Sequence, residues 1–229
     1  MATENFIITI DGPAGSGKTT VARKVAERLR FRFLDTGAMY RVATLAALEA
    51  GLGLDPPREA KILAVLESAG LNLDSAGVVM LSGRDVSVAI RSEEVTRWVS
   101  AVAALRPVRE FMVRRQKEFG LKAEPGLVAE GRDMGTVVFP GAAHRFYLDA
   151  SVEVRAGRRL LETCGGPPTS RHGAAMKAMA EEILARDEKD SARAEAPLRV
   201  GDGVQVIDTS DLSVEQVVER VLRSVRAPA

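Results

Sequence analysis

An eight-residue stretch near the start of the chain, Gly12-Pro13-Ala14-Gly15-Ser16-Gly17-Lys18-Thr19, constrains the fold more than any other feature of the sequence. It matches the pattern Gly-x-x-x-x-Gly-Lys-[Ser/Thr] at every fixed position. It also lies between a run typical of a strand, Phe6–Ile10, and a run with helical spacing, Thr19–Arg30. In such a loop the backbone N–H groups and the helix N-terminus surround a phosphate, the lysine reaches the β- and γ-phosphates, and the hydroxyl ligates Mg²⁺. The stretch therefore predicts a nucleotide-phosphate site with Mg²⁺ at Thr19.

The charge balance limits the classes of partner. Lys+Arg 32 against Asp+Glu 31 leaves a formal net charge of +1 over 229 residues, which excludes a general nucleic-acid coat. The single cysteine, Cys164, excludes an internal disulfide and fits a reducing compartment. We find no targeting segment and no apolar run long enough to span a membrane. We expect a cytoplasmic monomer with no membrane, nucleic-acid or obligate protein partner.

Strand-like and helix-like runs alternate along most of the chain. The strand-like runs are Phe6–Ile10, Phe31–Leu34, Gly126–Ala129, Arg145–Leu148 and Val204–Ile207. The helical patterns cover 19–30, 36–49, 58–68, 93–105 and 108–119 and begin again at Ser151 and Ser213. This alternation predicts an α/β fold with a mainly parallel central sheet. Three short runs separated by turn-forming residues predict a small antiparallel unit, at Leu71–Leu73, Val78–Leu81 and Val86–Val88.

Arginines gather on two predicted helix faces in the second half of the chain. The set with spacing i, i+3, i+4 is Arg155, Arg158 and Arg159. The set with spacing i, i+4, i+7 is Arg186, Asp190 and Arg193. Ion pairs on a solvated helix would give the same spacing. Because the two sets flank a Gly-Pro turn in a nucleotide-binding chain, we favour arginines on a closing lid that neutralise a transferred phosphoryl group.

Two further groups of polar residues follow predicted strands. One is Glu130-Gly131-Arg132-Asp133-Met134-Gly135-Thr136, after Gly126–Ala129. The other comprises Asp35, Thr36, Tyr40 and Arg41, after Phe31–Leu34. In open α/β sheets, ligands bind beyond the carboxyl ends of the strands. We therefore expect both groups to lie at the ligand-binding edge, beside the phosphate loop.

The phosphate loop leaves the reaction open. A GTPase would normally carry an Asn-Lys-x-Asp motif, and the sequence has none. Kinases of other acceptors, such as UMP, AMP or a non-nucleotide like shikimate, remain alternatives. So does a nucleotide-responsive binding module without turnover, although Lys18, Thr19 and the lid arginines favour turnover.

Together these residues resemble bacterial cytidylate kinases, which transfer the γ-phosphoryl group of ATP to CMP or dCMP. The resemblance covers nearly the whole chain and is carried by Leu34–Arg41, Pro107–Glu110, Glu130–Thr136 and the run from Arg186 to Leu198. It implies the three-layer phosphate-loop fold of nucleoside monophosphate kinases. The single domain, 1–229, would consist of a core (1–57, 120–150 and 195–229), a monophosphate-binding insert (about 58–119) and a helical lid (about 151–194).

The resemblance also implies a role for each matching residue. ATP would be bound by Gly12, Pro13, Ala14, Gly15, Ser16, Gly17, Lys18, Thr19, Thr20 and Arg158, with Thr19 on Mg²⁺. CMP would be bound by Thr36, Tyr40, Arg41, Ser100, Arg109, Arg132, Asp133, Arg186, Asp190 and Arg193. Catalysis would rest on Lys18, Arg155, Arg159 and Arg186.

Within the CMP set, the resemblance divides the ligand among three groups of side chains. The phosphate would be held by Arg41, Arg132 and Arg193, the ribose by Arg186 and Asp190, and the base by Ser100, Arg109 and Asp133. The chemistry agrees for the base, because a carboxylate suits the N4 amino group of cytosine and would face an unmatched oxygen in uracil. No carboxylate is singled out beside Thr19 at the metal.

Overall fold

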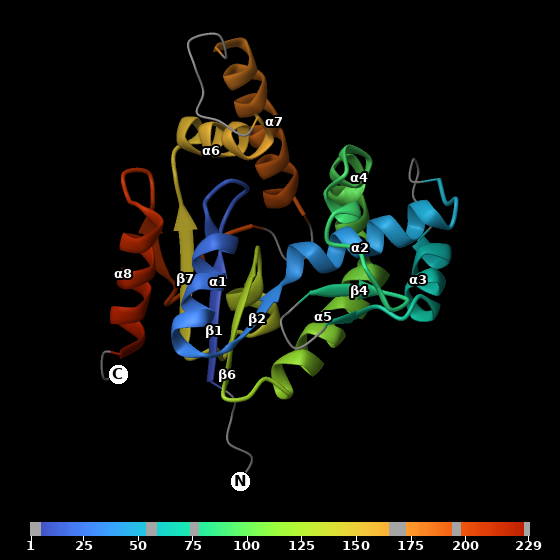
Figure 1. The fold of residues 1–229 in the computed structure, drawn as a ribbon, viewed down its shortest axis with the longest axis horizontal. Coiled ribbons are helices and arrows are strands. Elements are labelled where there is room, and N and C mark those ends of the chain that lie inside the picture. Colours follow the sequence, from blue (N-terminus) through green and yellow to red (C-terminus); the bar gives the residue numbers. More distant parts are fainter. Residues whose placement is uncertain (1–5, 54–58, 74–77, 165–172, 194–197, 227–229) are drawn as a thin grey trace. The chain divides into compact units, whose positions relative to one another are not determined.

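The computed structural model describes residues 6–53, 59–73, 78–164, 173–193 and 198–226 (Figure 1). The chain divides into two compact units, and each is built from two segments of the sequence. The first comprises Met1–Ile7 and Arg30–Ala129, and the second comprises Ile8–Leu29 and Glu130–Ala229. The predicted division into core, insert and lid follows other boundaries and stays a prediction.

Five strands form the main sheet, in the order β2-β6-β1-β7-β8. They are β1 (Phe6–Asp11), β2 (Arg32–Asp35), β6 (Gly126–Gly131), β7 (His144–Asp149) and β8 (Gln205–Asp208). β1 runs parallel to β7, with Ile8 opposite His144 and Asp11 opposite Tyr147, and β7 runs parallel to β8. With helices flanking this mainly parallel sheet, the predicted α/β fold is confirmed, and each predicted strand of this sheet is present within two residues of its expected bounds.

The helical segments of the second unit include the last residues of the phosphate loop and most of the predicted lid arginines. They are α1 (Lys18–Leu29), η2 (Met134–Val138), α6 (Val152–Cys164), α7 (Gly173–Ser191) and α8 (Val214–Arg226). α1 packs against α8 through buried valines on both helices, and α6 packs against α7 (Figure 1). The ion pairs Lys24–Glu215 and Arg28–Glu219 border the α1–α8 contact, but both are exposed and add little. Apolar packing on α8 therefore fixes the helix that follows the phosphate loop.

The helices of the first unit pack on one another around α2. They are α2 (Thr36–Glu49), α3 (Glu59–Ser68), η1 (Ala89–Arg91), α4 (Glu93–Ala104) and α5 (Arg106–Leu121). α2 begins where predicted, because Asp35 Oδ1 accepts a hydrogen bond from Ala38 N at 2.8 Å and caps the helix. α2 contacts both α3 and α4 (Figure 1). This packing places the polar side chains of the N-terminal half of α2 against other helices of the same unit.

The small antiparallel sheet is present, but its third strand was wrongly placed. Its strands are β3 (Asn72–Leu73), β4 (Val79–Leu81) and β5 (Arg84–Asp85), in the order β3-β4-β5. We expected Val86–Val88 to be the third strand and the residues before it to be the turn. The turn is only Ser82-Gly83, both with positive φ (49° and 76°), so pairing resumes at Arg84, opposite Leu81. The Asp74–Gly77 connection lies outside the described residues.

Two expected boundaries were also wrong. Helix α5 begins at Arg106 and not at 108, because Pro107 lies in its first turn, where a missing N–H costs nothing. Glu130 is the fifth residue of β6 and is 2% exposed, whereas we expected the strand to end at Ala129. Among the described helices, none is both long and apolar enough to cross a membrane.

Candidate active site

The phosphate loop joins β1 to α1 in a conformation that requires its glycines. Gly12 has φ 152°, and a Cβ built there would lie 2.2 Å from the backbone oxygen of Leu148. Gly15 has φ 77°, and its Cβ would lie 3.0 Å from the Cβ and the backbone oxygen of Arg155. The loop is therefore seated against β7 and α6, with no room for a Cβ at Gly12 and a tight contact together with a positive φ at Gly15.

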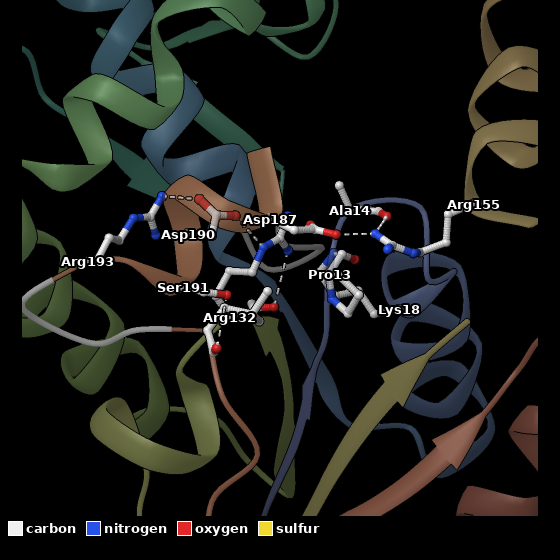
Figure 2. A network of polar contacts seen from close by, with 11 residues as sticks. Pro13, Ala14, Lys18, Arg132, Arg155, Asp187, Asp190, Ser191 and Arg193 are labelled. Atoms are coloured by element: carbon white, nitrogen blue, oxygen red, sulfur yellow. Dashed lines mark hydrogen bonds and ion pairs between the residues drawn. The ribbon is translucent and has the colours of Figure 1, made fainter. Parts of the chain in front are cut away.

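Two polar side chains of the loop, Ser16 and Lys18, are buried. Lys18 is buried, and its Nζ donates a hydrogen bond to the carbonyl oxygen of Pro13 at 3.2 Å (Figure 2). Ser16 is 1% exposed, and its Oγ has no hydrogen-bond partner among the described residues. Thr20, in the first turn of α1, is exposed. A buried hydroxyl without a partner and a buried ammonium group in the same loop fit an anion bound there.

Thr19 has a carboxylate partner to which the sequence analysis gave no role. Its Oγ1 donates a hydrogen bond to Oε1 of Glu130 at 2.8 Å, and Glu130 is buried in β6. These are two hard oxygen atoms of the kind that Mg²⁺ prefers, and Mg²⁺ normally takes one or two protein ligands and completes its shell with phosphates and waters. In the part of the chain that the structure describes, no group of three His, Cys, Asp or Glu could hold a metal ion alone. By the chemistry of their oxygens, Thr19 and Glu130 could hold a Mg²⁺ ion.

A second cationic cluster lies in the same unit (Figure 2). Asp190, near the end of α7, is 2% exposed and accepts hydrogen bonds from Nε of Arg132 at 3.0 Å and from Arg193 at 2.5 Å. The two arginine side chains are 16% and 12% exposed. Arg186 is half-buried one turn earlier on α7. The structure thus brings three of the predicted CMP residues together: Arg132, Asp190 and Arg193.

The turn after β6 is anchored by another residue that the sequence analysis missed. Asp11, the last residue of β1, accepts hydrogen bonds from the backbone N of Met134 at 2.9 Å and of Gly135 at 2.8 Å. Burial raises the pKa of Asp11 to about 6, and the two N–H donors oppose this rise. Asp133, the predicted base reader, is buried immediately before Met134. The sequence does contain one sign of this role, because Asp11 is an acidic residue at the end of a buried strand, directly before the phosphate loop.

The predicted lid arginines of α6 have different partners. Arg155 is buried and donates through Nε to Ala150 O at 3.0 Å and through a terminal nitrogen to Ala14 O at 3.2 Å (Figure 2). The same guanidinium group forms an ion pair with Asp187 of α7, a residue that the sequence analysis also missed. Arg155 therefore connects the phosphate loop with α6 and α7.

The other two arginines of α6 do not share this arrangement. Arg158 donates to Oγ1 and to the backbone oxygen of Thr209, at 3.0 and 2.6 Å, and burial lowers its pKa. Thr209 also donates to the backbone oxygen of Ser16 at 3.3 Å, which places Arg158 beside the phosphate loop. Arg159 forms an ion pair with the exposed Glu162 at 3.2 Å. The spacing thus identified one helix but not the separate partners of its arginines.

In the first unit, the predicted CMP residues lie on α2, α4 and α5. Thr36 and Tyr40 are buried on α2, and Cζ of the buried Arg109 lies 6.0 Å from the centroid of the Tyr40 ring. Arg41 donates to Ile90 O at 3.0 Å and to Oγ1 of Thr96 at 2.9 Å. Ser100 is half-buried on α4. In this unit, Arg109 of α5 therefore lies over the ring of Tyr40 on α2, and the same helix α2 carries a second arginine, Arg41.

The sequence matches the family model described as Cytidylate kinase over residues 8–227. A relative named cytidylate kinase from Paraburkholderia phymatum is 45% identical over 221 residues, which cover 96% of this chain and 93% of that protein. Another of that name, from Pseudomonas fluorescens, is 43% identical over 223 residues, which cover 96% and 94%. The crystal structure of an uncharacterized protein from Eubacterium ventriosum is 13% identical, with a TM-score of 0.50 over 98% of this chain and 100% of that one, and shares the fold. Because the family model and relatives above 40% identity extend over nearly the whole sequence, the chain belongs to the cytidylate kinase family.

Proposed function

We propose that this chain is an ATP-dependent cytidylate kinase that converts CMP or dCMP with ATP to CDP or dCDP and ADP. One observation carries the proposal beyond nucleotide binding: the buried carboxylate of Asp190 holds Arg132 and Arg193 together as a second cationic cluster. Two guanidinium groups on one carboxylate form a ready site for the oxygens of a second phosphate. The unit that carries the donor loop thus also carries groups suited to a phosphate acceptor.

The donor would be MgATP. The backbone of residues 12–17 would surround its phosphates, and Lys18 would exchange the Pro13 carbonyl for phosphate oxygens. Thr19 would hold Mg²⁺, with Glu130 as its buried carboxylate partner. When bound, Mg²⁺ would neutralise charge on the β- and γ-phosphates. Thr20 and Arg158 would complete the ATP site from α1 and α6.

The acceptor would be recognised by its phosphate, its sugar and its base. Arg41, Arg132 and Arg193 would bind the phosphate, and Arg186 with Asp190 the ribose hydroxyls. Ser100, Arg109 and Asp133 would read cytosine, with Thr36 and Tyr40 lining the pocket. The carboxylate of Asp133 would accept from the N4 amino group, and Arg109 would donate to O2 and N3. Uracil would place an acceptor opposite Asp133, at a cost of roughly 1–3 kcal/mol for the unmatched buried group.

The chemical step needs no general base, because the attacking oxygen of the CMP phosphate is already anionic. That oxygen forms a bond to the γ-phosphorus of ATP, and the bond to the bridging oxygen breaks to release ADP. Lys18, Arg155, Arg159 and Arg186 would neutralise the charge on the transferred group. A closed lid would also exclude water that could take the phosphoryl group instead.

A panel of acceptors tests the proposal directly. ADP release from MgATP is measured with CMP, dCMP, UMP, AMP and shikimate at equal concentrations. We expect CMP and dCMP to give kcat/KM at least about tenfold above the others, as one mismatched buried group predicts. Similar rates with AMP or shikimate would contradict the acceptor. Binding of CMP and ATP without ADP release would favour the alternative of a binding module.

Two variants separate the donor from the acceptor. Lys18→Ala is expected to abolish turnover and leave CMP affinity within about twofold, because the lysine serves the donor phosphates. Asp133→Ala is expected to impair CMP use far more than ATP affinity. An active Lys18→Ala enzyme would refute the mechanism, and equal losses for both nucleotides in Asp133→Ala would refute base reading.

The proposed setting is a cytoplasmic monomer whose partners are its nucleotide substrates. The near-neutral charge of the chain supports this, since a nucleic-acid or anionic-membrane partner would favour a basic excess. Sedimentation of active enzyme at the chain mass of 24.6 kDa is the expected result. Activity found only in a larger species would contradict it.

A further inference from the structure

Asp11 is a buried acidic residue that has no role among the proposed catalytic and binding groups. It ends β1, is 5% exposed and directly precedes Gly12, the first glycine of the phosphate loop. Its two carboxylate oxygens accept one backbone hydrogen bond each, Oδ1 from Met134 and Oδ2 from Gly135. These donors are the two residues that follow Arg132-Asp133. One side chain thus connects the donor loop with the turn that carries two acceptor-binding residues.

The contact between β1 and the turn at Met134-Gly135, called the seam below, contains a second residue of β1 that makes no hydrogen bond to the turn. Thr9 lies two positions before Asp11, so both side chains project from the same face of the strand. A Cβ added to Gly135 would lie 2.8 Å from Oγ1 of Thr9, which shows that the turn rests on this face. Thr9 is fully buried, and its Oγ1 has no hydrogen-bond partner among the described residues. Thr9 therefore packs against the turn, whereas Asp11 binds it.

The chemistry of the contact requires a carboxylate. An ionised Asp accepts hydrogen bonds through both oxygens, whereas Asn of the same shape has one acceptor and one NH₂ donor. In Asn the NH₂ would face a backbone N–H, and one of the two amides would lose its partner. Burying a carboxylate is costly, so a residue that only filled space here would be more stable as a neutral one.

We propose that Asp11 is a positioning residue that fixes the Arg132–Asp133 turn, and with it the acceptor phosphate and base contacts, relative to the phosphate loop. The inference rests on the proposed function, because it assumes that Arg132 and Asp133 bind the acceptor. It assigns Asp11 to acceptor geometry and not to ATP affinity.

The test compares Asp11→Asn with Thr9→Val as a matched control. Both variants change one buried side chain of the same seam and keep its volume, but only the first alters hydrogen bonds to the turn. Affinities for CMP and ATP are titrated separately, and kcat/KM is measured for CMP and UMP. We expect Asp11→Asn to weaken CMP binding about tenfold or more and to reduce the CMP/UMP ratio by a similar factor, because small misplacements at a site are expensive. ATP affinity should stay within about twofold, and Thr9→Val should match the wild type.

Several results would overturn the inference. The inference is wrong if the CMP affinity of Asp11→Asn lies within twofold of that of Thr9→Val. It is also wrong if Asp11→Asn loses CMP and ATP affinity equally. If Asp11→Asn does not fold, hydrogen exchange of the wild type decides instead. The Met134 and Gly135 amides should then exchange at least about a hundredfold more slowly than that of the exposed Gly141, and equal exchange would refute the contact. A wild type that does not phosphorylate CMP refutes the proposed function, while the exchange measurement still reports on Asp11.

Discussion

Removing the carboxylate of Asp190 should destabilise the free protein and make it responsive to phosphate. In the native structure this carboxylate pairs with both Arg132 and Arg193, whose side chains are 16% and 12% exposed. Asp190→Ala would leave two largely buried guanidinium groups facing each other. Breaking a buried ion pair by removing one partner costs about 3–5 kcal/mol. Because both arginines retain some solvent, we expect a loss at or just below the lower limit of this range, about 2–3 kcal/mol of the free energy of unfolding.

Inorganic phosphate should restore much of this loss. A ligand that binds only the native state at 100 times its Kd adds about 2.7 kcal/mol. In Asp190→Ala, phosphate would take the place of the carboxylate between the arginines, whereas in the wild type the carboxylate competes with it. The stabilisation by phosphate should therefore be larger in the variant than in the wild type, provided that both are measured at the same ionic strength.

The assay is urea unfolding at 25 °C with and without phosphate, with sodium chloride as the salt control. Glu162→Ala is the matched variant, because it removes a carboxylate from an exposed arginine pair and should cost less than about 0.5 kcal/mol. If Asp190→Ala and Glu162→Ala lose the same stability, or if chloride restores Asp190→Ala as well as phosphate does, the reasoning about this cluster is refuted.

Three further predictions concern the phosphate loop and the residues next to it in sequence or in space. Gly12→Ala would bring its Cβ within 2.2 Å of Leu148 O, so ATP affinity should fall at least about a hundredfold by calorimetry; affinity within threefold of the wild type would contradict the tight fit. Burial raises the pKa of Asp11 from 3.8 to about 6. Between these two pH values, Asp11 therefore holds a proton in the native state but has released it in the unfolded chain. The stability contributed by neutral Asp11 is therefore complete below about pH 3.8 and lost as the pH rises through about 6, by about 3 kcal/mol in all. Urea unfolding from pH 4 to 7 should show this fall in the wild type relative to Asp11→Asn, and parallel curves would refute it. Glu130→Gln should raise the Mg²⁺ concentration for half-maximal activity about tenfold, because Thr19 loses its charged partner; an unchanged Mg²⁺ requirement would exclude Glu130 from the metal site.

The features that were predictable from sequence are those set by neighbouring residues. The phosphate loop is a fixed local pattern, and its glycines take the positive φ values that such a loop demands. The start of α2 was also local, because Asp35 caps the helix three residues before Ala38. The antiparallel turn shows the limit of this reasoning. Turn-forming residues extended from Ser82 to Asp85, and only the backbone conformation at Ser82-Gly83 determined that two of the four belong to the turn.

The features that escaped the sequence analysis depend on partners far away in the chain. Arg155 pairs with Asp187 across two helices, and spacing on one helix identifies no such partner. Glu130 was placed outside its strand because a lone acidic residue in an apolar run normally ends it. Its burial is tolerated since Thr19, 111 residues earlier, donates a hydrogen bond to it. Asp11 was overlooked for the same reason, as its donors lie 123 and 124 residues later.

The discontinuity of the second unit has a consequence for biosynthesis. Its opening segment, Ile8–Leu29, contains most of β1 and all of α1, yet the partners β7 and α8 belong to the segment Glu130–Ala229. At about 5–20 residues per second, roughly 10 to 40 s separate the synthesis of α1 from that of α8. The continuous stretch Arg30–Ala129 can collapse during that interval and β6 is available to pair with β1, whereas β1 must wait for β7 and α1 must wait for α8. The segment that binds nucleotide is thus among the first parts of this chain to be synthesised and among the last able to fold.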